Sequence, residues 1–514
     1  MLVGAGILLS RLAGLVRQRV LGHYLGTSTA ADAYTAALRI PNFLQNLLGE
    51  GVLSASFIPV YASLRAQGNE AQARKVAGAV AGLLALVTGL FALAGMAATP
   101  WLLDAIAPGF QGETRDLAIV LVRIFFPGIS LLVLSAFCIG VLNSHHKFFL
   151  SYAAPVVWSA AIVVALVAGA HRGETRAGLA VWAAWGAVAG GGLQLAVQLP
   201  SVLGLLGAGA RLSLGRGDEH VREVVKNFLP VVVGRGVVQL SAWIDTLIAS
   251  WLPSGTVAAF GYAQTIYTLP VSLFGMAVSA ASLPSMSAEA AVHEKLRERT
   301  EQGLRSIAFP VVPSIAAFLA LGDIICAALF QTGAFGARDV RYVWLILAGS
   351  TVGLLAATQG RLYSSAFYAL RDTRTPLRYA TVRVLLTALL GIAAGLWLPK
   401  ILNVDARYGA AGLTASAGVA GWIEFWLLRR GLSAKIGAVQ LPGGLLVKLW
   451  LSAGAATAAA TGLRYVVPHA LHPVLRAAVI LGAFGAVYLG TALALQVPQA
   501  ADALGRLRRL VNRR

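Results

Sequence analysis

Three arginines interrupt an apolar stretch near the start of the sequence. Arg11, Arg17 and Arg19 stand between VGAGILL and VLGHYLG. A charged side chain at the centre of a bilayer costs at least about 2.5 to 3.5 kcal/mol, so it usually faces a cavity or a partner instead of lipid. Arg11 and Arg17 are about 120° apart around a helix and can both border one wide cavity. Because a guanidinium group matches two phosphate oxygens at once, the predicted ligand carries phosphate.

A stripe of polar residues follows in the range 30–64. Four of its residues fall within about 40° of one line on a helix, and a fifth lies about 80° away. They are Asp32, Arg39, Asn46 and Glu50, with Asn42 as the fifth. The stripe rises about 27 Å, close to the thickness of the hydrocarbon layer, so it predicts the wall of a hydrophilic pathway. The alternative is that these charges only pair with neighbouring helices and hold a bundle together.

Composition indicates the elements that position these residues. The chain has 514 residues, 58% hydrophobic and 12% charged, whereas a soluble chain is about 25% charged. Backbone groups in lipid must bond within their own helix, and apolar runs of about 20 residues recur along the chain. We therefore expect an all-α polytopic membrane protein with fourteen transmembrane helices, at residues 2–25, 30–64, 76–104, 116–142, 149–170, 177–208, 222–252, 256–286, 302–324, 339–370, 376–398, 408–430, 442–464 and 474–498.

The basic residues indicate the orientation. Of 41 lysines and arginines, 24 fall in loops and tails on one side of the predicted membrane and 9 on the other. By the positive-inside rule the richer side is cytoplasmic, which places both termini in the cytoplasm. The net charge of +20 therefore reflects topology, and we expect no nucleic-acid partner.

The chain partly repeats itself. LGTSTAADAYTAALRIP, which ends at Pro41, resembles LPSGTVAAFGYAQTIYTLP, which ends at Pro270. Six predicted spans separate the copies, so both halves have the same orientation, as in transporters built from parallel repeats around a central cavity. The predicted division is an N-terminal lobe at 1–208, a C-terminal lobe at 209–430, a helix pair at 431–498 and a basic cytoplasmic tail at 499–514.

Further charges lie within the predicted spans, at Arg123, Arg235, Asp245, Arg361, Arg383 and Glu424. Asp245 is a candidate site for coupling, because a buried carboxylate can bind Na⁺ or a proton. The two cysteines, Cys138 and Cys326, lack metal-ligand spacing, and we expect no cofactor. The expected energy source is Na⁺, protons or the membrane potential.

Several long motifs resemble the MurJ/MviN family of lipid II flippases. They are SRLAGLVRQRVLGHYLGTSTAADAYTAALRIPNFLQNLLGEGVLSASFIPVY, GVLNSHHKFFLSYAAPVVWS, FGMAVSAASLPSMS, LFQTGAF and SAFYALRDTRTPLR, within the first 430 residues. The chain is also similar to the wider multidrug/oligosaccharidyl-lipid/polysaccharide exporter superfamily. The resemblance implies two six-helix lobes around a cationic cavity, a final helix pair forming a groove for the polyprenyl tail, and alternating access in the bacterial inner membrane.

The resemblance also implies roles for particular residues. By position, the cavity arginines of the first helix correspond to Arg11 and Arg17, the acid of the second helix to Asp32, and the acid of the gate region to Glu50. Asp245 matches an acid proposed as a sodium ligand in part of the family. Glu50 and Asp245 are thus the candidates for gating or ion coupling.

The sequence departs from the family at several positions. Neutral residues stand at Gln45 or Asn46 and at Thr265, where members commonly carry arginine. Thr387 and Gly391 stand where sodium-binding members carry Asn and Asp. These departures weaken the expected pyrophosphate clamp by two charges and leave the sodium site incomplete.

The leading functional hypothesis is a lipid II flippase that acts as a monomer among membrane lipids. A flippase for another polyprenyl-linked oligosaccharide is the second. A multidrug cation antiporter is the third, and arginines in its cavity oppose it by charge. A membrane enzyme acting on lipid phosphates is disfavoured, because the 21 acidic residues are scattered and form no metal-binding cluster.

Overall fold

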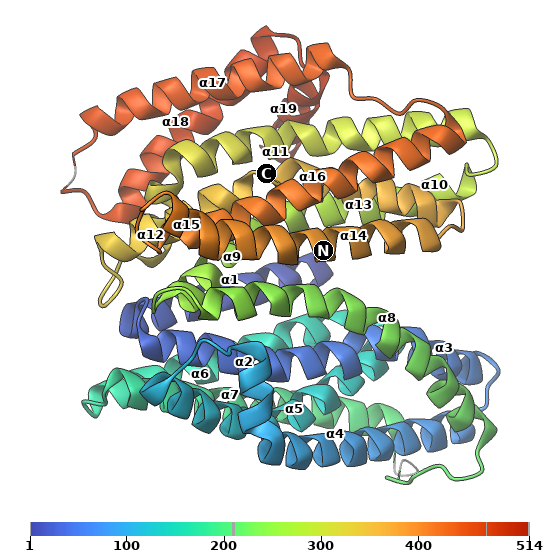
Figure 1. Cartoon of the computed structure of the whole chain (residues 1–514). Coiled ribbons are helices and arrows are strands. Elements are labelled where there is room, and N and C mark those ends of the chain that lie inside the picture. The colour runs from blue at the N-terminus through green and yellow to red at the C-terminus, as the bar shows by residue number, and fades with distance from the viewer. Residues whose placement is uncertain (1, 208–210, 469, 512–514) are drawn as a thin grey trace. The chain divides into compact units, whose positions relative to one another are not determined.

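The computed structural model consists of helices joined by loops (Figure 1). It describes the backbone of residues 2–207, 211–468 and 470–511; within them, the side chains at 2–5, 7, 8, 41, 50, 229, 233–242 and 506–511 lie outside the description. The helices are α1 (Leu2–Leu25), α2 (Thr29–Leu48), α3 (Glu50–Ala66), α4 (Glu70–Ile106), α5 (Gly112–Ser144), α6 (Phe148–His171), α7 (Arg176–Leu206), α8 (Glu219–Ser250), α9 (Thr256–Pro270), α10 (Ala277–Ala288), α11 (His293–Phe330), α12 (Ala337–Thr351), α13 (Leu354–Ala369), α14 (Arg374–Ile392), α15 (Leu398–Ile401), α16 (Tyr408–Ile436), α17 (Gly443–Val466), α18 (Pro473–Ala494) and α19 (Pro498–Val511).

The predicted fold class is confirmed. In the described part of the chain, eleven helices are long and apolar enough to cross a membrane, or twelve if the bent pair α12 and α13 forms one span. Two other long helices, α1 and α8, correspond to the predicted spans 2–25 and 222–252. The count of fourteen stays a prediction, because it requires α1 and α8 to cross the membrane as well.

Four predicted spans contain a break or a π-helical turn, and one of them is the span 376–398, with a π-helical turn at Ala393–Trp397. The span 30–64 divides at Gly49 into α2 and α3, and α12 meets α13 at an angle of 44°. In the span 256–286, a π-helical turn at Val271–Met276 follows Pro270 and leads into α10. Proline has no backbone N–H to donate, so the hydrogen-bond pattern changes where it stands. A prediction of spans from average apolarity does not resolve such breaks.

The chain divides into two compact units by internal contacts. Unit 1 comprises Met1–Ala258 and Thr332–Phe335, and unit 2 comprises the remainder. This boundary differs from the predicted lobe boundary at 208/209, because α8 packs against α2, α3 and α4 of unit 1. The units are defined by packing contacts, whereas the predicted lobes are defined by the sequence repeat. The lobes therefore stay a prediction.

Small residues bring helices of unit 1 close together. On α7, an added Cβ at Gly190 would lie 2.9 Å from the carbonyl oxygen of Trp158, and one at Gly186 would lie 2.6 Å from the Cβ of Ala165. Helices in membranes associate through this kind of close contact, since lipid tails supply little hydrophobic drive. The tight contact between α6 and α7 fixes the backbone at Trp158.

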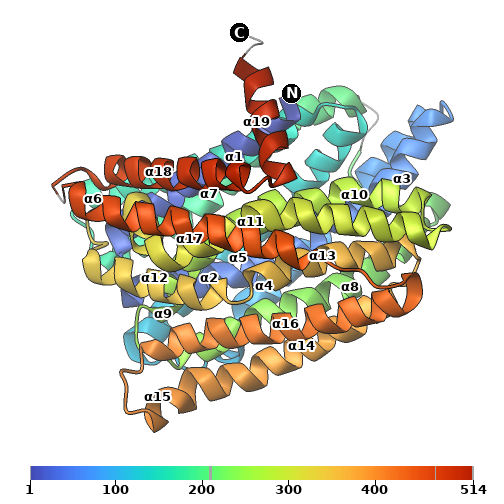
Figure 2. The same ribbon diagram turned by 90° about the horizontal axis from the view of Figure 1, so that it is seen from above.

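Unit 2 is built around α11, which packs against α12, α13, α17 and α18. The hydroxyl of Tyr488 on α18 donates a hydrogen bond of 2.6 Å to the carbonyl oxygen of Phe309 on α11. Figures 1 and 2 both place α17 and α18 beside α11, and Figure 2 shows α19 turning away from α18. The charges within predicted spans are partly paired here, as Arg383 of α14 lies 3.2 Å from Glu424 of α16.

Asp372, in the turn between α13 and α14, has a low pKa. Its Oδ2 accepts a hydrogen bond of 2.6 Å from Lys435 Nζ and another from the hydroxyl of Thr375, and its Oδ1 accepts one from the backbone N–H of Thr375. The hydrogen bond from Lys435 is the largest cause that holds the pKa of Asp372 well below its usual range. A depressed pKa stabilises the fold above the unfolded value of about 3.9, and this stabilisation is lost as the pH falls through the folded value.

We therefore expect D372N to lower the thermal stability of the purified protein at neutral pH. The lost free energy of unfolding should be about 1 kcal/mol at most, because the pair is partly exposed. Thermal midpoints of both proteins should differ by a constant amount from neutral pH to about pH 4 and converge below it. A difference that is unchanged in stronger acid would contradict this assignment.

Candidate ligand cavity

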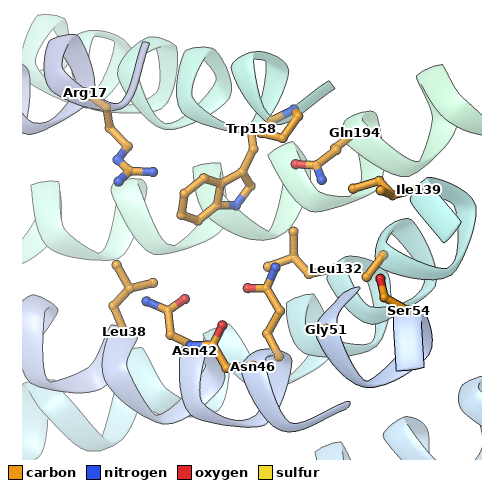
Figure 3. A pocket seen from close by; sticks show the side chains of 13 residues that line it. Arg17, Leu38, Asn42, Asn46, Gly51, Ser54, Leu132, Ile139, Trp158 and Gln194 are labelled. Atoms are coloured by element: carbon orange, nitrogen blue, oxygen red, sulfur yellow. The ribbon is translucent and has the colours of Figure 1, made fainter. Parts of the chain in front are cut away.

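Unit 1 contains a cavity of about 700 Å³ (Figure 3). Side chains from α1, α2, α3, α5, α6 and α7 surround it. Its lining residues are Arg17, Leu38, Asn42, Gln45, Asn46, Gly51, Ser54, Leu132, Ala136, Ile139, Pro155, Trp158 and Gln194. The volume lies within the range of about 300 to 1,000 Å³ that is usual for small-molecule sites.

The break between α2 and α3 builds one wall of the cavity. α2 begins after Ser28, whose hydroxyl caps the helix by accepting a hydrogen bond of 3.3 Å from the backbone N–H of Ala31. At Gly49 an added Cβ would lie 2.3 Å from the carbonyl oxygen of Gln45, so this backbone path requires glycine. The last turns of α2 and the first turns of α3 thereby line one space.

Arg17 supplies a positive charge to the cavity. Its Cζ lies 4.4 Å from the centre of the Trp158 ring, in a cation–π contact. The Nε of Arg17 and the hydroxyl of Tyr34 are both buried and have no hydrogen-bond partner among the described residues. Buried polar atoms are nearly always bonded, so the described protein groups leave the guanidinium of Arg17 incompletely satisfied.

Carboxamide groups make up much of the remaining polar lining. Asn42, Gln45 and Asn46 come from α2, and none of their side chains hydrogen-bonds to another residue in the described part of the chain. Gln194 comes from α7 and donates a hydrogen bond of 2.8 Å to the hydroxyl of Ser135. Figure 3 shows Asn42, Asn46, Gln194 and Trp158 pointing into the same space as Arg17.

The structure corrects the predicted place of Asp32. Its side chain is 3% exposed and is not part of the cavity lining. The carboxylate instead accepts hydrogen bonds from the backbone N–H groups of Gly255 and Ala258, the latter at 2.8 Å. These groups lie at the start of α9, where the first N–H groups of a helix lack partners of their own. Asp32 therefore satisfies a helix N-terminus, and the predicted polar stripe does not reach the cavity at this end.

Other predicted site residues fall in different surroundings. Arg11 is exposed and does not line the cavity, in contrast to Arg17 on the same helix. Arg39 is half-buried and interacts electrostatically with Asp245 of α8. Asp245 thus has a cationic neighbour within unit 1, which the sequence did not indicate. The side chain of Glu50 lies outside the described residues.

Sequence reasoning missed most of the lining of this cavity, including Trp158 and Gln194. Trp158 stands in a continuous apolar run and Gln194 in a run of small and apolar residues, so neither carries a distinguishing local pattern. Gln45 was noted only as a departure from the family pattern. A polar residue in an apolar span is a weak signal that could have marked Gln194.

The comparisons with known proteins establish the family. The family described as lipid II flippase MurJ matches residues 21–480. The chain belongs to the MurJ family. A MurJ relative from Burkholderia cenocepacia, named lipid II flippase MurJ, is 32% identical over 83% of this chain and 81% of its own length. The recognition from the sequence motifs is therefore confirmed.

Solved structures agree on the fold. A lipid II flippase MurJ in an inward closed conformation superposes with a TM-score of 0.79 at 22% identity, over 98% of this chain and 99% of the other. An inward-facing multidrug resistance transporter of the MATE family has a TM-score of 0.67 at 17% identity, over 83% of this chain and 95% of its own. Membership of the MurJ family places the chain among transporters and not among enzymes.

Proposed function

We propose that this chain moves lipid II, the undecaprenyl-pyrophosphate-linked disaccharide-pentapeptide, from the cytoplasmic to the outer leaflet by alternating access. The observation that carries the proposal is Arg17, a cation held in a polar cavity among membrane-spanning helices. A pyrophosphate cannot remain in hydrocarbon without a compensating charge. The family of the chain supports lipid II as the lipid that carries it.

An amphiphilic ligand also needs a place for its tail. An apolar hollow of about 400 Å³ lies between α11 and α18 in unit 2. Its walls include Phe309, Phe318, Phe484 and Leu489. We assign this hollow to the polyprenyl chain, which keeps the tail in a lipid-like environment while the headgroup crosses. The family resemblance implies a tail groove in the final helix pair. This assignment adds α11 as a wall of the groove, opposite α18.

The orientation and energy source belong to the same proposal. Both termini face the cytoplasm of the bacterial inner membrane, since the basic residues concentrate on that side. The chain acts as a monomer on lipid II among membrane lipids. Na⁺, protons or the membrane potential drive it, and Asp245 with its neighbour Arg39 is the candidate coupling pair.

The carboxamide lining favours a second candidate, a flippase for another polyprenyl-linked oligosaccharide. Asn42, Gln45 and Asn46 are neutral, so the cavity offers less charge to a pyrophosphate than the family pattern implies. Neutral amides hydrogen-bond equally well to the hydroxyl groups of many glycans. The location of Arg17 opposes a multidrug cation antiporter, because like charges repel.

Complementation tests the proposal. The gene should restore growth to a bacterial strain depleted of its own lipid II flippase, and it should not restore export in a strain that lacks a flippase for a different polyprenyl-linked glycan. Membrane fractions of both strains should contain the protein at equal levels. Rescue of the second strain without rescue of the first would replace lipid II by the other glycan lipid.

A further inference from the structure

The cavity in unit 1 has an aromatic ring next to its cation. Trp158 reaches the cavity from α6, and its Nε1 donates a hydrogen bond of 3.0 Å to the carbonyl oxygen of Ala187 on α7. This bond orients the ring, and the close approach of Gly190 to the backbone of Trp158 fixes the position from which the ring extends. Arg17 lies 4.4 Å from the ring centre, so a group bound to Arg17 has the indole as its neighbour.

The groups around this ring are neutral and can both donate and accept hydrogen bonds. Asn42 and Asn46 come from α2, and Gln194 comes from α7 (Figure 3). A carboxamide has two donor hydrogens and an acceptor oxygen. These groups add no charge to that of Arg17, and the face of the indole is apolar, so this part of the cavity suits an uncharged, hydroxyl-rich group.

We propose that Trp158, Asn42, Asn46 and Gln194 form a subsite for a sugar ring of the headgroup, adjoining the phosphate site at Arg17. A sugar ring has a face of C–H groups that packs on an aromatic ring, here on the face of the indole that Arg17 does not cover, and a rim of hydroxyl groups that hydrogen-bond to amides. In a glycosyl pyrophosphate the first sugar is bonded directly to the phosphate. The adjacency of Trp158 to Arg17 matches that covalent order.

This inference rests on the proposed function and adds a determinant of specificity to it. Arg17 binds any polyprenyl pyrophosphate, with or without sugar. Trp158 and the carboxamides bind only the glycosylated lipid. A purely structural Trp158, which holds Arg17 in position, would instead affect both lipids alike.

Binding to two lipid probes separates these roles. Purified protein in detergent or nanodiscs is titrated with lipid II and with undecaprenyl pyrophosphate, which lacks the sugars. We expect the wild-type protein to bind lipid II more tightly. W158A should weaken lipid II binding by about tenfold and change undecaprenyl pyrophosphate binding by less than about twofold, while W158F retains most of the preference. R17A should weaken the binding of both probes.

A matched control is present in the same unit. Trp182 forms a cation–π contact of 4.9 Å with Arg172 and is not part of the cavity lining, so W182A should leave both affinities unchanged. Equal weakening of both probes by W158A, or no weakening, would overturn the sugar subsite. If the wild-type protein binds both probes equally, this inference alone fails. If it binds neither, the proposed function fails with it.

Discussion

Replacing Arg17 with alanine should abolish lipid II flipping while the protein still inserts into the membrane. Arg17 is the only cationic side chain among the described residues that line the cavity, and its Nε is buried without a hydrogen-bond partner there. Its removal leaves the pyrophosphate without a counter-charge in a site of low dielectric constant, which costs several kcal/mol. The measurement is growth of a flippase-depleted strain that expresses R17A at wild-type levels.

Two further variants give this experiment its controls. R172A removes an arginine that stacks on Trp182 away from the cavity, so growth should be retained. R11A removes the other arginine that the sequence assigned to the ligand, and its effect should be smaller than that of R17A because its side chain is exposed and outside the lining. Full growth with R17A would refute the role of this arginine in the cavity.

Replacing Asp32 with alanine should destabilise the protein. The buried carboxylate accepts hydrogen bonds from the backbone N–H groups of Gly255 and Ala258. Each buried donor left without a partner costs about 1 to 3 kcal/mol. We expect D32A to give little folded protein, and D32N, which keeps one acceptor oxygen, to fold with a lower thermal midpoint. Fluorescence-detected size-exclusion chromatography of heated samples measures both.

Ligand affinity distinguishes this structural role from the predicted role in substrate binding. Folded D32N, held below its thermal midpoint, should bind lipid II as the wild-type protein does. D104N provides the control, because Asp104 forms an exposed ion pair with Arg115 at 2.9 Å, and such pairs contribute little to stability. A D32N protein with wild-type stability and weakened binding would restore Asp32 to the ligand site.

The membrane class, the order of the spans and the family could be predicted from the sequence. Each of these depends on local properties: an apolar run long enough to cross the bilayer, a helical period, or a motif of consecutive residues. The prediction of a cavity cation on the first helix rested on the same kind of reasoning, since an arginine in an apolar run must be compensated nearby. Arg17 meets this expectation and Arg11 does not line the cavity, although both stand in the same run.

Only the tertiary structure decided which groups meet. Asp32 and Ala258 are 226 positions apart, and no local pattern links a carboxylate on one helix to the N-terminus of another. Trp158 lines the cavity because glycines on α7 let α6 approach and because its Nε1 bonds to Ala187. Helical periodicity fixes which residues share a face, whereas packing between distant segments fixes what that face contacts. The sequence alone therefore determined that a charge is held within the membrane, and the packing of six helices determined which charge faces the ligand and which neutral groups surround it.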